Sequence, residues 1–195
     1  MKILIIYCHP SKNSFTEVVK EEFLRGLKQA GHEYVVSDLY NMNFQTDITE
    51  EDYLREAFYH QEIPLCNEVI SEQEKIQEAD AITFIYPVFW TEAPAKLVGW
   101  FDRVWSVGFA YGTDAKMKLL EKALFIAVAG KTLQSLEETG EIQAMKTVML
   151  GDRIRDRATI KEFVILEGTT RWNESARDEN CKKHMETVFQ LGNKF

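Results

Sequence analysis

Residues 81–105, AITFIYPVFWTEAPAKLVGWFDRVW, run from an apolar segment through an aromatic loop into an amphipathic segment. Residues 81–86 are almost continuously apolar, which is typical of a strand that is covered on both faces of a sheet. Pro94 stands where the first turn of a helix tolerates proline. Apolar residues then recur at helical spacing: Leu97, Val98, Phe101, Val104 and Trp105. The stretch therefore predicts a buried strand followed by a helix that packs on the sheet.

The same alternation of strand and helix extends over the whole chain. Besides residues 81–86, the predicted strands cover residues 2–7, 34–38, 123–128 and 163–166. The predicted helices cover residues 15–30, two parts of residues 47–79 on either side of Pro64, and residues 94–105, 142–150 and 176–191. Right-handed crossovers between such elements produce a parallel sheet with helices on both faces. We expect an α/β fold, a doubly wound five-stranded parallel sheet of order 2-1-3-4-5, in one domain of residues 1–195.

The composition is that of a globular protein that does not bind nucleic acid. The chain has 195 residues, of which 45% are hydrophobic, and this is enough to bury a core in a single domain. The formal net charge of -8 leaves no surplus of cations to neutralise a phosphate backbone. We therefore expect small-molecule chemistry and no nucleic-acid partner.

Apolar runs and cysteines indicate a cytoplasmic protein without a membrane span. The longest runs, such as residues 3–7 and 124–129, are far shorter than the roughly 20 residues that a spanning helix needs. The N-terminus lacks the long apolar region of a secretory signal. Cys8, Cys66 and Cys181 include no close pair, which disfavours a disulfide framework and a thiolate metal site. We expect reduced thiols and no metal.

A sheet of this order binds its ligand outside the carboxyl ends of its first and third strands, where the strand order reverses. The loop after the first strand leads directly into a helix, and free N–H groups at such a helix start favour a phosphate. His9, Ser14 and Thr16 add further donors. Alternatively, Ser14 and Glu17 form a capping box that needs no ligand. The loop lacks the glycines of a dinucleotide-binding Rossmann site and of a P-loop.

The loop after the third strand places two large aromatic side chains at the same point. Its backbone amides can hydrogen-bond the polar edge of a flat heteroaromatic ligand, while Phe89 and Trp90 form apolar walls. The alternative is that both side chains pack on the following helix. Trp100 and Trp105 of that helix are expected in the core or in a subunit interface.

Three stretches resemble the flavodoxin-like NAD(P)H:quinone oxidoreductase family, which includes soluble NAD(P)H dehydrogenases and ancillary subunits of potassium-efflux systems. One is a histidine followed five residues later by Ser-Phe and a small polar residue: His9, Ser14, Phe15 and Thr16. The most specific runs over residues 86–104 and continues into residues 108–112, and a third lies in residues 38–44. The resemblance covers about residues 2–112 and implies a flavodoxin-like fold.

The resemblance implies a flavin cofactor, FMN or alternatively FAD. The residues that would hold its phosphate are His9, Ser14, Phe15 and Thr16. The residues that would contact its isoalloxazine ring are Pro87, Val88, Phe89, Trp90 and Gly130. NADH or NADPH, and then a quinone or similar flat electron-poor acceptor, would react in turn by a ping-pong hydride transfer, for which no acid or base residue is demanded. Family members are homodimers, and residues 96–112 are the expected dimer contact.

The resemblance weakens after the fourth strand. The larger quinone reductases carry Thr-Gly-Gly there, followed by a Tyr and a His that assist charge relay, whereas residues 129–136 read AGKTLQSL. Gly130 either permits close approach of a flavin or serves a turn. Lys131 either faces an anionic flavin or a cofactor phosphate, or it is a solvated loop lysine. His184, the next histidine, is expected to be a solvated side chain on a surface helix.

Two other functions remain open from the sequence. The acidic composition permits a flavodoxin-type electron carrier, but such carriers lack a counterpart of WFDRV at residues 100–104. The altered residues 129–136 permit a flavin-binding, redox-sensing regulatory subunit of a transporter. A serine hydrolase is disfavoured, because the Gly-x-Ser-x-Gly elbow is absent.

Overall fold

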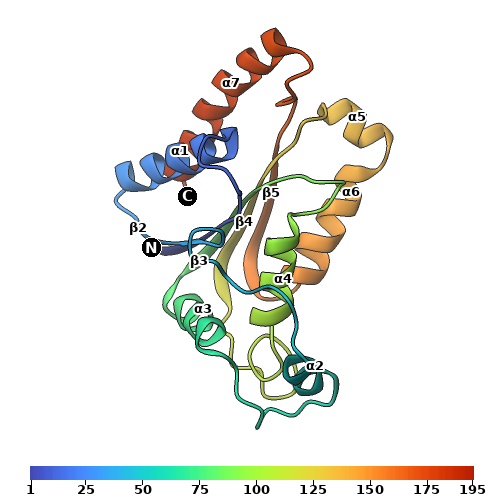
Figure 1. Ribbon diagram of the computed structural model, residues 1–195. Helices are drawn as coiled ribbons and strands as arrows, with labels where there is room; N and C mark the ends of the chain where they lie inside the picture. The colour runs from blue at the N-terminus through green and yellow to red at the C-terminus, as the bar shows by residue number, and fades with distance from the viewer.

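Five parallel strands form the central sheet in the order β2-β1-β3-β4-β5 (Figure 1). The computed structural model describes all 195 residues. The strands are β1 (Lys2–Tyr7), β2 (Glu33–Asp38), β3 (Ala81–Pro87), β4 (Leu120–Val128) and β5 (Ala158–Leu166). The expected doubly wound α/β fold is confirmed. In β5, however, the strand begins at Ala158 and not at residue 163, because this edge strand starts with exposed polar and charged residues that break the apolar pattern.

Helices cover both faces of the sheet (Figure 1). They are α1 (Phe15–Gln29), α2 (Glu50–Ala57), α3 (Asn67–Glu78), α4 (Ala95–Val104), α5 (Leu133–Glu138), α6 (Glu141–Lys146), the π-helical segment η1 (Thr147–Ile154) and α7 (Glu174–Asn193). Helices α1 and α7 pack on one face, and α3, α4 and η1 pack on the other. The sequence analysis did not predict α5, and it took α6 and η1 together as one helix. None of the helices is long and apolar enough to cross a bilayer.

Alternate side chains of the central strands fill two apolar clusters, one on each face. In β1, Leu4 and Ile6 belong to the cluster that contains Trp100 of α4, and Ile3 and Ile5 belong to the cluster beneath α1. All four β1 side chains are at most 1% exposed. Burial on both faces explains why the strand is continuously apolar, as the sequence analysis expected.

The aromatic side chains of α4 and of the residue after it belong to the core. Trp100 and Phe101 are 0% and 1% exposed, and Trp105 is 8% exposed. The indole N–H of Trp100 donates to the buried carboxylate of Glu72 at 3.0 Å. These rings therefore lie in the core, one of the two locations that the sequence analysis left open for them, and a dimer contact through residues 96–112 stays a prediction.

Two glycines allow α1 and α7 to touch. A Cβ atom at Gly26 would overlap the carbonyl oxygen of Phe189 and would lie 2.8 Å from the backbone nitrogen of Asn193. A Cβ atom at Gly192 would overlap the carbonyl oxygen of Phe23. Close approach of the two backbones therefore requires glycine at both positions.

We expect the substitution Gly26→Ala to destabilise the protein. Overpacking at a close contact costs about 1–3 kcal/mol, which outweighs the gain of up to about 1 kcal/mol from the higher helix propensity of alanine. Urea unfolding followed by circular dichroism measures the difference. The matched control is Gly151→Ala, since nothing lies within 4 Å of a Cβ atom there. Unchanged stability of Gly26→Ala would contradict the close approach.

Candidate active site

Two adjoining cavities open at the carboxyl ends of the strands. The α1 cavity has a volume of about 350 Å³ and the α5 cavity about 540 Å³, and they share Val88 and Gly130. Both volumes lie in the range of small-molecule sites. The α1 cavity is lined by His9, Ser11, Asn13, Ser14, Phe15, Thr16, Pro87, Val88, Phe89, Val128, Gly130, Thr169, Arg171 and Arg177. Every residue of the two loops that the sequence analysis singled out, except Trp90, therefore lines this one cavity.

The start of α1 carries backbone N–H groups without an acceptor in the chain. Those of Ser14, Phe15 and Thr16 make no hydrogen bond, as is usual in a first turn. The Ser14 hydroxyl accepts from the Glu17 N–H at 3.1 Å, which confirms Ser14 as the N-cap. The reciprocal bond of a capping box is absent, because the Glu17 carboxylate pairs with Lys20 at 2.5 Å. Capping therefore uses one N–H group and leaves three others available for an anion.

The loop's own backbone fixes the ring of His9. Its Nδ1 lies 2.9 Å from the backbone nitrogen of Ser11 and 3.0 Å from the Ser11 carbonyl oxygen. Burial lowers the pKa of His9, so that the imidazole is neutral at pH 7. His9 can therefore contribute a neutral polar contact to the α1 cavity, and the positive charge there comes from other residues.

Two arginines supply that charge, and the sequence analysis missed both. Arg171 precedes α7 and Arg177 lies in its first turn, and both line the α1 cavity. The Nε–H of Arg177 is buried without a hydrogen-bond partner in the chain. A buried donor without an acceptor is unfavourable, so this group is suited to an anionic ligand. No motif marks these arginines, because only the strand order brings them to the start of α1.

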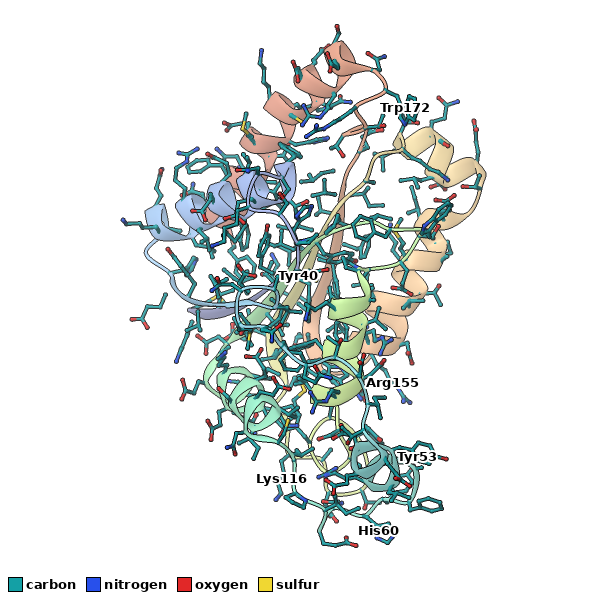
Figure 2. All side chains as sticks on the ribbon, viewed as in Figure 1. Tyr40, Tyr53, His60, Lys116, Arg155 and Trp172 are labelled. Carbon is teal, nitrogen blue, oxygen red and sulfur yellow. The ribbon has the colours of Figure 1, made fainter.

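The α5 cavity is flanked by two exposed indole rings. Its lining residues are Val88, Trp90, Thr91, Ala129, Gly130, Lys131, Leu136, Glu141, Thr170 and Trp172. Trp90 is 100% exposed and Trp172 is 96% exposed. Figure 2 shows Trp172 on the loop that leads into α7, close to α5. Because Trp90 is fully exposed, the alternative that it packs on the following helix is wrong, and Phe89 is half-exposed.

A strained turn holds Trp90 at the α5 cavity. Phe89 and Glu92 exchange two backbone hydrogen bonds of 2.8 and 2.9 Å, and the two residues between them have positive φ angles, 52° at Trp90 and 66° at Thr91. Such turns favour glycine or asparagine, and each non-glycine residue held there costs about 1–3 kcal/mol. Backbone strain of this kind persists where the side chain has a function.

Backbone hydrogen bonds hold the neighbouring loops that form the walls of the cleft side by side. Val88 N–H donates to the carbonyl of Val128 at 2.8 Å, and Thr169 N–H donates to the carbonyl of Ala129 at 3.1 Å. Gly130 lies between these contacts. A Cβ atom at Gly130 would meet only Thr170, at 3.7 Å, and its φ is not positive. The chain's own turn therefore does not require glycine at this position, which leaves the close approach of a ligand as the remaining interpretation.

Lys131 and Glu141 form an ion pair at the α5 cavity, with Nζ and Oε1 2.5 Å apart. The Thr139 hydroxyl donates to the same carboxylate oxygen at 3.0 Å. The hydrogen bond from Lys131 lowers the pKa of Glu141, with smaller contributions from Thr139 and Thr91. Lys131 is therefore neither unpaired nor buried, and its partner remains ionised at neutral pH.

His184 is not the solvated side chain that the sequence analysis expected. It is 7% exposed, and its Nε2 lies 2.8 Å from the carbonyl oxygen of Glu167. The Glu167 carboxylate in turn accepts from the Leu133 N–H of α5 at 2.5 Å. The expectation fails because α7 packs against α1, which places the His184 ring 6.4 Å from the ring of Phe15, measured between centroids. His184 thus anchors the loop that carries Arg171 and Trp172.

Metal and thiol chemistry have no support at this site. No group of three or more His, Cys, Asp or Glu side chains is arranged to hold a metal ion. Cys8 is buried beside the first loop, and burial raises the pKa of its thiol to about 12. The thiol is therefore protonated and unreactive at neutral pH.

Known proteins share both sequence and structure with this chain. A family model described as "Flavodoxin-like fold" matches residues 1–188. The solved NAD(P)H:quinone oxidoreductase from Methanothermobacter marburgensis is 41% identical, with a TM-score of 0.89 over 98% of this chain and 96% of that one. Ribosyldihydronicotinamide dehydrogenase [quinone] from Pongo abelii is 33% identical over 71% of this chain and 68% of its own length.

A further relative matches over a shorter stretch. NAD(P)H dehydrogenase [quinone] 1 from Cavia porcellus is 37% identical over 56% of this chain, and the match spans 45% of that protein's length. The family match over nearly the whole chain, the relatives and the observed strand order agree with one another. The chain belongs to the flavodoxin-like NAD(P)H quinone oxidoreductase family and is an oxidoreductase.

Proposed function

We propose that this protein is a flavin-dependent oxidoreductase that passes a hydride from NADH or NADPH to a quinone or a similar flat, electron-poor acceptor. The observation that carries the proposal is the pair of adjoining cavities. The α1 cavity joins free N–H groups to two arginines, which suits a phosphate. The α5 cavity has the indole of Trp90 and open backbone at Gly130, which suits a planar ring.

The residues of the chain fit a flavin along the whole cleft. The N–H groups of Ser14, Phe15 and Thr16, together with Arg177, would hold the phosphate, and His9 would add a neutral contact. Pro87, Val88, Phe89, Trp90 and Gly130 would surround the ring. Bound flavin would supply the hydride chemistry. The chain's own task is to orient the ring and to exclude water from its face.

A single ring site explains why the two substrates would react in turn. With the flavin ring in the α5 cavity of about 540 Å³, nicotinamide and acceptor would stack in turn on the same open face of the ring, in a ping-pong cycle. A site of this kind recognises flatness and electron deficiency, and it can therefore accept several aromatic acceptors. No acid or base residue is required for hydride transfer itself.

The absorbance spectrum of the purified protein tests the proposal. We expect a yellow protein whose flavin, after extraction, is identified as FMN or as FAD. Anaerobic addition of NADPH or NADH should bleach the colour, and a quinone should restore it. A flavin that is not bleached by either nucleotide would favour a one-electron carrier. Protein that binds neither FMN nor FAD would refute the proposal.

We also propose that the protein forms a homodimer. Large aromatic side chains are exposed on and just after α2: Tyr53, Phe58 and Tyr59 are 58%, 60% and 63% exposed. Figure 2 shows Tyr53 on this helix, at the opposite end of the molecule from Trp172. Exposed aromatic clusters of this kind favour a protein interface. Light scattering should give twice the chain mass of 22.6 kDa.

Replacing Thr16 by Val removes the hydroxyl from the α1 cavity and keeps the shape of the side chain. A hydrogen bond to a charged group contributes about 1.5–3 kcal/mol, so we expect flavin affinity to fall by roughly one to two orders of magnitude. Fluorescence titration of the apoprotein measures the change. Thr187→Val on α7, whose hydroxyl bonds Lys183, is the control. Equal affinity in Thr16→Val would contradict the phosphate site.

Replacing Trp90 by Ala separates a ligand role from a packing role. Because Trp90 is 100% exposed, we expect the free energy of unfolding to change by no more than about 0.5 kcal/mol. The KM for nicotinamide or acceptor, or the Kd of the flavin, should rise. Trp100→Phe is the contrasting variant: it leaves the Glu72 carboxylate without its indole donor and should cost about 1–3 kcal/mol of stability. Loss of stability in Trp90→Ala without a change in binding would support the packing role.

A further inference from the structure

The α5 cavity carries charge at one place only. Among its lining residues, Lys131 is the sole cation and Glu141 the sole anion, and they pair at 2.5 Å. The arginines of the cleft, Arg171 and Arg177, line the α1 cavity instead. The side chains that would bind the flavin phosphate are therefore separate from the charged side chains that would lie next to the flavin ring.

Both members of the pair are held in place by the loops around the cavity. The carbonyl of Lys131 accepts from the Gly168 N–H at 2.9 Å, which fixes its backbone against the loop after β5. Glu141 begins α6 and accepts from the Thr139 hydroxyl at 3.0 Å. The side chain of Glu141 is 17% exposed and that of Lys131 is 55% exposed. The carboxylate is thus the anchored partner, and the ammonium is the accessible one.

A flavin ring bound in the α5 cavity would exclude water from its side of this pair. Interactions between charges strengthen when high-dielectric water is removed. The oxidised flavin ring is neutral and the reduced ring is readily anionic, so that a nearby cation favours the reduced form and a nearby anion opposes it. Because the Lys131 side chain is 55% exposed, the ion pair contributes little to folding stability, and stability does not account for its place at the cavity.

We propose that the Lys131–Glu141 ion pair sets the reduction potential of the flavin, an inference that rests on the function proposed above. Lys131 stabilises the anionic reduced ring. Glu141 limits this stabilisation by neutralising part of the lysine charge.

The affinity of the apoprotein for oxidised and for reduced flavin tests the proposal without an activity assay. The flavin extracted from the purified protein is titrated anaerobically in both states. For Lys131→Met we expect affinity for oxidised flavin within twofold of wild type and affinity for reduced flavin about tenfold lower. For a two-electron couple, a tenfold weaker binding of reduced flavin relative to oxidised flavin corresponds to a reduction potential that is lower by about 30 mV. Lys131→Arg keeps the charge and should retain the wild-type ratio.

The variant Glu141→Gln distinguishes electrostatics from packing. Because this substitution leaves the lysine charge without its partner, reduced flavin should bind more tightly relative to oxidised flavin. This shift is opposite to that in Lys131→Met and raises the reduction potential of the flavin. Lys182→Met, at an exposed lysine of α7, is the control and should behave as wild type. Circular dichroism checks that each variant is folded.

The possible outcomes separate this inference from the function on which it rests. Opposite shifts in Lys131→Met and Glu141→Gln support it. An unchanged ratio in both, or shifts in the same direction, would overturn it while leaving the flavin site intact. Failure of the wild-type protein to bind flavin in either state would overturn the proposed function, and this inference with it.

Discussion

The parallel pairing of β1 with β3 is the constraint on which the site depends. The chain leaves β1 for α1 on one face of the sheet and leaves β3 for α4 on the other, so the two loops diverge and open a crevice between them. Hydrogen bonds continue the ladder past the strand ends, from Cys8 N–H to the carbonyl of Ile85 at 3.0 Å and from Val88 N–H to that of Val128 at 2.8 Å. The free N–H groups of α1 and the aromatic turn are fixed relative to each other because these bonds fix the loops.

The cleft has opposite physical character at its two ends. The α1 cavity gathers donors and positive charge, including the unpartnered buried Nε–H of Arg177. The α5 cavity is flanked by indole rings that the fold leaves in water, whereas Trp100 is wholly buried. Trp90 is 100% exposed on a turn with a positive φ angle, a conformation that costs free energy for a residue other than glycine. This strain lies at the wall where the proposed function places a planar ring.

Prediction of strands and helices from the sequence was most accurate where the local pattern of apolar residues agrees with the tertiary environment. Strands β1 and β3 and the part of β4 from Ala123 to Val128 are almost continuously apolar because both their faces are covered, so these residues were recognised directly. The first three residues of β4 were missed because they include the charged Glu121 and Lys122. The start of β5 was missed because an edge strand exposes residues such as Lys161 and Glu162. The expectation for His184 failed because its burial comes from the packing of α7 on α1, which no local pattern records. The short α5 was missed because six residues carry little helical periodicity.

The sequence by itself determined the class of fold, the strand order and the two loops at the crevice, because apolar runs, helix-start residues and crossover handedness are local or topological properties. It also determined the family, through residues 86–104. Only the tertiary structure decided that Arg177 joins the helix start of α1, that Trp90 faces solvent, and that Lys131 meets Glu141. The physical reason is distance along the chain: the contacts of these side chains depend on how separate loops stack above the sheet, and no spacing within the sequence encodes that stacking.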